Sequence, residues 1–235
     1  MALSPDTADS FVREVDENLR RDQMAARAKR YGGLGIAAII LFLIAIAAYL
    51  YWQDRQRQQA EAGTEQLSVA LQDIGANRMA TAPATLDTLR QSEADGVKAI
   101  AGLTRAALAL QQGNRKLAAT IYGEIAADDG LPKPYRDLAL VRGTSLDFDT
   151  IKPDEVIARL QPLAVPGQPF FGSAGEMIAM ALLAKGQKPA AAQLFARIAA
   201  DQGVPDSLRA RAVQVAGTLG VDASASLPTG PTAAE

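Results

Sequence analysis

The residues with the clearest potential for chemistry are four acidic side chains that lie close together in the sequence. They are Asp147, Asp149, Asp154 and Glu155, and clustered carboxylates of this kind can bind calcium. A calcium-binding EF-hand loop turns sharply at a central glycine and ends on a glutamate at its twelfth position. No such glycine follows Asp149. The spacing therefore favours a solvated loop that caps the next helix over a metal site.

The rest of the inventory also argues against catalysis. Residues 185–188 (KGQK) lack the glycine-rich lead and the Lys-Ser or Lys-Thr ending of a phosphate-binding loop, so we interpret them as a turn between helices. Histidine and cysteine are absent, which excludes a Ser-His-Asp triad, most zinc sites and a disulfide framework. The sequence predicts a protein that is not an enzyme, with no catalytic, metal-binding or cofactor-binding residue and no cofactor.

One apolar stretch stands out among the elements that would position the chain. Residues 32–52 (GGLGIAAIILFLIAIAAYLYW) contain no charged side chain. At about 1.5 Å per residue such a helix is about 30 Å long, which matches the hydrocarbon core of a bilayer. Tyr49, Tyr51 and Trp52 end the stretch, and aromatic rings favour the headgroup layer. We interpret residues 32–52 as a single transmembrane helix that contacts the lipid bilayer.

Two other interpretations of this stretch fit less well. A signal peptide has an apolar region of about 7–15 residues behind a short basic leader, whereas about thirty residues with six acidic groups precede this one. A buried helix of a soluble domain is seldom apolar on all sides for five turns. A retained anchor is the better interpretation.

The flanking charges predict the orientation of the anchor. Five basic residues lie in the twelve positions before it, and only Arg55 and Arg57 lie in the thirteen after it. By the positive-inside rule the N-terminus stays in the cytoplasm. We therefore expect a single-pass protein of a bacterial inner membrane, with its C-terminal domain in the periplasm. The near-neutral net charge of −2 makes nucleic acid an unfavourable partner.

Four segments follow from this layout. Residues 1–31 are a cytoplasmic segment, with a flexible leader over 1–9 and then an amphipathic helix with an apolar stripe at Phe11, Val15 and Leu19. That helix is either a solvated extension of the anchor or a docking helix. Residues 32–52 are the transmembrane helix and residues 53–219 a periplasmic helical repeat domain. Residues 220–235 are small, polar and proline-containing, which predicts a disordered tail.

An internal repeat organises the predicted periplasmic domain. Shifting the chain by 73 residues aligns residues 101–143 with residues 174–216, with 15 identical residues in 43 positions. Gly113 aligns with Gly186 and Pro132 with Pro205. Each copy therefore reads as a helix, a glycine-containing turn, a second helix and a proline stop. A period of 73 is about two tetratricopeptide repeats of 34 residues, so a more diverged hairpin is expected between the two copies.

Several elements outside the two copies follow from apolar spacing. The chain after the span is expected to be helical to Gly75, with Leu67, Leu71 and Ile74 on its buried side. A short helix opens at Pro83, with Leu86 and Leu89 inward. The diverged hairpin is expected at 135–146 and 154–163, ended early by Pro162. Its predicted inward residues are Leu138, Val141, Ile157, Leu160 and Leu163. Residues 208–219 are expected to form a final helix with Arg209 and Arg211 on its solvated face.

The repeat resembles the tetratricopeptide pattern. Ala118-x3-Tyr122 and Ala191-x3-Phe195 match the Ala-x3-aromatic of the second helix, and Ala106 and Ala179 match the small residue of the first helix. Gly102 and Gly175 occupy the place of the first-helix tryptophan, which is a departure typical of degenerate members. The resemblance implies an all-α fold in which a tetratricopeptide-like α-solenoid of stacked helical hairpins follows one transmembrane helix.

The whole layout is similar to the ancillary SecYEG translocon subunit family (YfgM-like proteins). The similar features are the acidic-basic N-terminal helix, the basic edge ending in KRYG, the span closing on YLYW and the Ala-rich repeats. The resemblance implies a scaffold that links the Sec translocon to periplasmic chaperones and their clients. The alternative is a cell-envelope assembly or division factor that uses the same array. The sequence indicates that other proteins are the partners and leaves the partner-binding residues unknown.

Overall fold

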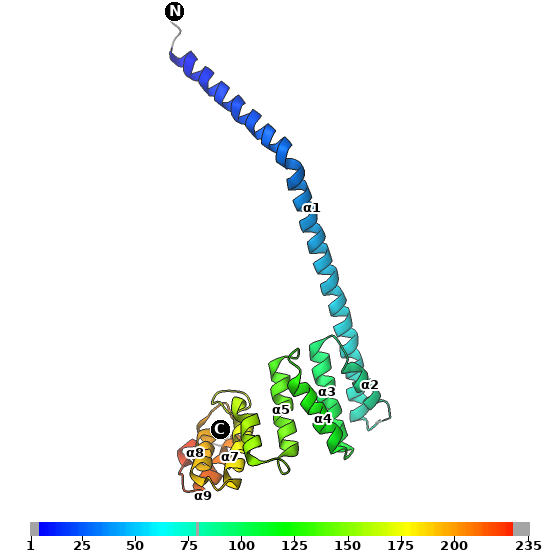
Figure 1. Cartoon of the computed structure of the whole chain (residues 1–235), viewed down its shortest axis with the longest axis vertical. Helices are drawn as coiled ribbons and strands as arrows, with labels where there is room; N and C mark the ends of the chain where they lie inside the picture. Colours follow the sequence, from blue (N-terminus) through cyan, green and yellow to red (C-terminus); the bar gives the residue numbers. More distant parts are fainter. Residues whose placement is uncertain (1–4, 79, 228–235) are drawn as a thin grey trace, which may run out of the picture. The chain divides into compact units, whose positions relative to one another are not determined.

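The computed structural model describes residues 5–78 and 80–227, and within them all regular structure is helical (Figure 1). The chain divides into two compact units, Met1–Gln58 and Gln59–Glu235. The first helix, α1 (Pro5–Gly75), contributes to both. It begins at Pro5, so the predicted flexible leader is wrong for residues 5–9; proline is favoured in the first turn, where its missing N–H has no helical partner. Residues 1–4 lie outside the described chain.

The apolar stretch forms one continuous part of α1. The large apolar side chains described between Ile39 and Trp52 are exposed. By length and composition this part of α1 can cross a membrane, and none of its apolar window is buried within the protein. The side chains of the predicted stripe at Phe11, Val15 and Leu19 lie outside the description.

The last turns of α1 belong to the second unit and have one buried side. Leu67 and Ala70 are buried there, in a cluster with Leu86, Leu89 and Val97. The prediction was right for Leu67 and wrong for Leu71, which is 45% exposed. The buried side runs instead through small residues, because a side chain on Gly63 would lie 3.2 Å from Val97.

Eight further α-helices follow within the described residues. They are α2 (Ala82–Leu89), α3 (Asp95–Gln111), α4 (Arg115–Ala127), α5 (Lys133–Asp147), α6 (Pro153–Leu160), α7 (Phe171–Ala184), α8 (Lys188–Ala200) and α9 (Asp206–Thr218). The two predicted copies are the hairpins α3–α4 and α7–α8, each turning at a glycine with positive φ, Gly113 (77°) and Gly186 (75°). Left-handed backbone favours glycine, which explains why this residue repeats at both turns.

The two glycines at the place of the family tryptophan allow close helix packing. A side chain on Gly102 would lie 2.9 Å from Ile125 Cδ1, and one on Gly175 would lie 3.1 Å from Ile198 Cδ1. In each hairpin an isoleucine of the second helix therefore fills the space that a large first-helix side chain would need. This isoleucine takes up the space of the missing tryptophan, and it is the same residue type in the two copies.

The diverged middle hairpin is α5–α6. Val141, Leu160 and Leu163 are buried as predicted, whereas Leu138 and Ile157 are half-buried. The helix α6 ends at Leu160, and Pro162 lies in the 3-10 turn η1 (Gln161–Leu163). The hairpin is therefore shortened at its second helix, as the proline predicts.

The end of the array differs from the prediction in two ways. Arg211 is exposed and pairs with Glu176 at 2.6 Å, but Arg209 is buried and donates to the Ala199 carbonyl at 3.0 Å. The predicted disordered tail is wrong at its beginning, because residues 221–227 fold back and contain the 3-10 turn η2 (Ser224–Ser226). Apolar packing of Ala223 stabilises this segment. The remainder, residues 228–235, lies outside the described chain.

The Gly102–Ile125 contact gives a test of the packing. We expect Gly102→Leu to lower the free energy of unfolding by about 1–3 kcal/mol through overpacking. Ile125→Ala should lower it by about 2–5 kcal/mol through a cavity. The double variant should lose less free energy of unfolding than the two single variants lose together, because alanine at position 125 would leave room for leucine at position 102. Circular dichroism of the full-length protein under denaturant measures all three. Additive losses would contradict the described contact.

Candidate protein-interaction surface

The acidic residues noted in the sequence lie beside cations. Asp147 ends α5 and lies 3.9 Å from Arg159, which also bonds Glu155 at 2.5 Å. Asp154 pairs with Lys185, which lies at the predicted turn between α7 and α8. Asp149 is exposed. Across residues 5–78 and 80–227 no group of three acidic side chains could hold a metal ion.

One layer of the array is built from alternate helices. The helix α3 contacts α5, α5 contacts α7, and α7 contacts α9. The exposed side of α3 presents Ile100, Leu103, Ala107 and Leu110, spaced by three and four residues. Ile100 and Leu110 are each 37% exposed, and no charged residue lies on this side of the helix. An uncharged apolar stripe facing solvent is typical of an interaction surface.

The same side of α7 is apolar only toward its C-terminal end, because Glu176 stands at the position of Leu103 and pairs with Arg211. Shifted by 73 residues, Ala107 and Leu110 correspond to Met180 and Leu183, and Met180 is 46% exposed. Between them, α5 presents the half-buried Tyr135 and Leu138 and, one turn further on, the exposed Arg142. Because α3, α5 and α7 lie side by side in one layer, we call these residues together the inner face. Methionine is flexible and polarisable, which suits a surface that adapts to different partners.

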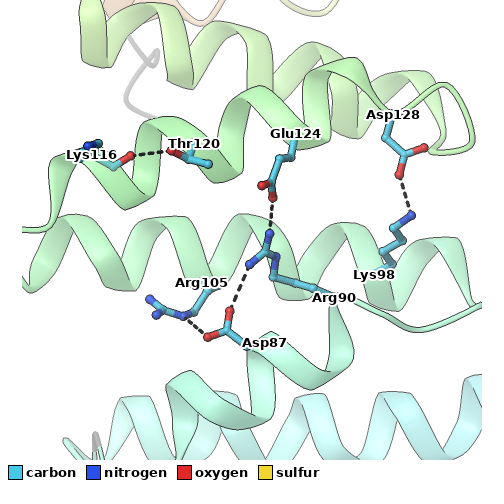
Figure 2. A network of polar contacts seen from close by, with 8 residues as sticks. All are labelled: Asp87, Arg90, Lys98, Arg105, Lys116, Thr120, Glu124 and Asp128. Carbon is cyan, nitrogen blue, oxygen red and sulfur yellow. Dashed lines mark hydrogen bonds and ion pairs between the residues drawn. The ribbon is translucent and has the colours of Figure 1, made fainter.

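A polar network holds the first hairpin to the helix before it (Figure 2). Asp87 of α2 accepts from Arg90 and from Arg105 of α3, both at 3.1 Å. Arg90 also pairs with Glu124 of α4. Arg105 leaves α3 on a different side from the apolar stripe, since their positions differ by more than a quarter turn. The network therefore fixes α3 against α2 and α4 without placing charge on the apolar stripe of α3.

A second ion pair fixes the end of the hairpin (Figure 2). Lys98 Nζ lies 2.6 Å from Asp128 Oδ2, and the other oxygen of Asp128 accepts from the Gly130 N–H at 3.0 Å. Asp201 makes the same turn with the Gly203 N–H at 2.8 Å. The hydrogen bond from Lys98, followed by that from Gly130, lowers the pKa of the Asp128 carboxyl below its ordinary value.

The repeat pattern and the fold together identify the family. Residues 28–215 match the family described as a tetratricopeptide repeat-like domain. The chain belongs to this family. Comparison with curated proteins gave no significant match, and comparison with solved structures gave none either. Tetratricopeptide repeat-like arrays are protein-interaction scaffolds whose stacked hairpins present extended binding surfaces, and they are typically not enzymes.

Sequence reasoning named no interaction residue, although part of the signal was present. The spacing Ile100, Leu103, Ala107 and Leu110 follows one helix face, as does Met177, Met180 and Leu183. The sequence alone could not tell an exposed apolar stripe from a buried one, because both have the same period.

The lowered pKa of Asp128 predicts a pH dependence of stability. A carboxyl whose pKa is lower in the folded state stabilises the fold above its unfolded pKa, which is about 3.9. That contribution is lost as the pH falls through the folded pKa. Asp128→Asn should therefore be less stable than the wild type at pH 7, and the difference should shrink below about pH 4. Chemical denaturation of the full chain across pH measures it. The control is Asp149→Asn, which removes the same charge from an exposed carboxylate; an equal loss there would contradict the role of Asp128.

Proposed function

We propose that the chain is a membrane-anchored, non-enzymatic scaffold that holds partner proteins beside a bacterial inner membrane. The observation that carries the proposal is the uncharged apolar stripe of α3, continued by Met180 and Leu183 of α7, in a tetratricopeptide repeat-like array. The apolar part of α1, long enough to span a bilayer, supports the anchor. The family match also covers this part of the chain. Anchoring would raise the effective concentration of the array near partners in the same membrane.

The finer proposal places the array at the Sec translocon. Residues 1–31 are then cytoplasmic, residues 32–52 span the membrane, and residues 53–219 face the periplasm, where they link the translocon to chaperones. The excess of basic residues before the span supports this orientation. The resemblance to the ancillary SecYEG translocon subunit family supports the partners. A flexible apolar surface suits contact with many different polypeptides.

Topology is the first test. Alkaline phosphatase and green fluorescent protein are fused separately after Glu235 of the full chain. We expect active phosphatase, no fluorescence and an uncleaved mass. A fluorescent, phosphatase-negative pair of fusions would place the array in the cytoplasm and overturn the translocon proposal.

Site-specific crosslinking in intact cells tests the inner face. A photo-crosslinking residue at Leu110 or Met180 should capture a translocon or periplasmic chaperone subunit, identified by mass. The control position is Lys116, an exposed residue outside the inner face. With the photo-crosslinking residue at Leu110, the substitution Met180→Glu should reduce the crosslinking yield about tenfold, because a charge in an apolar contact costs more than about 1.4 kcal/mol. Capture only of cell-wall or outer-membrane assembly proteins would favour the envelope-assembly function instead.

A further inference from the structure

A second surface of the array lies between α4 and α5. It is an open trough of about 470 Å³, on a different side of α5 from the inner-face residue Leu138. Small residues of both helices line it: Ala119, Gly123 and Ala126 of α4, and Ala139 and Gly143 of α5. Arg159 of α6 also lines it. We call it the α4–α5 trough. Small side chains let another backbone approach closely.

The internal repeat places an equivalent trough between α8 and α9, and there it is covered. Ala192, Ala199 and Ala216, which correspond to Ala119, Ala126 and Gly143, are fully buried. The cover is the chain's own segment Val221–Leu227, which turns back after Gly220 (φ 91°). The Val221 N–H bonds the Ala216 carbonyl at 2.9 Å as the cap of α9, and Val221 and Ala223 pack against the same cluster as Ala199 and Ala216. A short segment that is extended over residues 221–223 and then turns at η2 therefore fits this kind of trough.

The arginine that holds the covering segment has a counterpart on α5. Arg209 donates to the Ala199 carbonyl at 3.0 Å and to the Ser226 carbonyl of the segment at 3.1 Å. Its counterpart in the first copy is Arg136, whose Nη1 pairs with Asp129 at 2.5 Å and whose Nε is buried without a partner among the described residues. Thr144, which lines the trough, is only 1% exposed, and its hydroxyl also lacks a partner there. Buried polar groups are normally bonded, so the Thr144 hydroxyl, whose side chain lines the trough, indicates a missing ligand.

Gly123 gives an independent indication. It lies inside α4, where glycine costs about 0.5–1 kcal/mol relative to alanine. A side chain there would meet nothing within 4 Å, so the packing of the chain itself does not require glycine. The corresponding residue of the covered trough is Ala196. The missing side chain keeps the centre of the α4–α5 trough open.

We propose that the α4–α5 trough binds a short segment of a partner protein that is extended at small apolar side chains in alternate positions, as in Val221-x-Ala223, and then turns as residues 224–226 do. A backbone carbonyl of that segment accepts from Arg136, as Ser226 does from Arg209. This site is separate from the inner face and does not depend on the orientation of the membrane anchor. The array then holds two partners at once, one on each surface.

The test uses the full-length protein in detergent and a labelled, acetylated peptide with the sequence of residues 220–227, GVDASASL. Fluorescence anisotropy should show saturable binding. Gly123→Leu fills the trough and should weaken binding about tenfold or more, while leucine raises helix propensity and leaves the fold intact. The matched control is Gly217→Leu in α9, an exposed glycine that likewise has nothing within 4 Å. It should bind as the wild type does.

A second variant tests the polar contact. Arg136→Ala should weaken binding about threefold to tenfold, and Arg136→Lys should restore part of it. Unchanged binding by Gly123→Leu would overturn the proposal, because the peptide would then sit elsewhere, for example by displacing the native segment from α8–α9. A concentration-dependent dimer that Gly123→Leu abolishes would also overturn it, by identifying a second copy of the chain as the occupant.

Discussion

The array depends on helices approaching one another more closely than bulky side chains allow. Each clear hairpin meets this constraint with a glycine on its first helix and an isoleucine on its second, Gly102 with Ile125 and Gly175 with Ile198. Buried alanines continue the contact along α3, α4, α7 and α8. Close backbones leave little room for adjustment, so the core is specified by shape rather than by large side chains. The ion pairs of Figure 2 then lock the first hairpin to α2 at its surface.

Much of this fold can be predicted from the sequence, because glycine and proline residues at the helix ends recur in the repeat together with the alanines. Glycine at the left-handed turns and proline before α5 and α9 recur at a 73-residue shift and mark helix ends directly. Prediction failed where one residue type suits two environments. The sequence predicts a solvent-exposed Arg209. The residue is buried instead, because its guanidinium donates hydrogen bonds to two backbone carbonyls. Leu71 reads as a core residue, yet α1 packs through Gly63 and Ala70 instead.

The candidate surfaces were less predictable than the fold, for a physical reason. The binding surfaces of a repeat array consist of residues that are not buried between helices. They can be identified only when the neighbours of each helix are known. The α4–α5 trough illustrates this point. Its alanines look the same in sequence as those of the covered α8–α9 trough, and the difference lies in the segment Val221–Leu227 that follows only one of them.

The position of the single tryptophan makes the two units spectroscopically separate. Trp52 ends the apolar stretch within the unit Met1–Gln58, and the described array in Gln59–Glu235 contains tyrosine as its only strongly emitting residue. Excitation at the red edge of protein absorbance therefore reports on the surroundings of Trp52 alone. Its emission colour follows the polarity around the end of the apolar stretch.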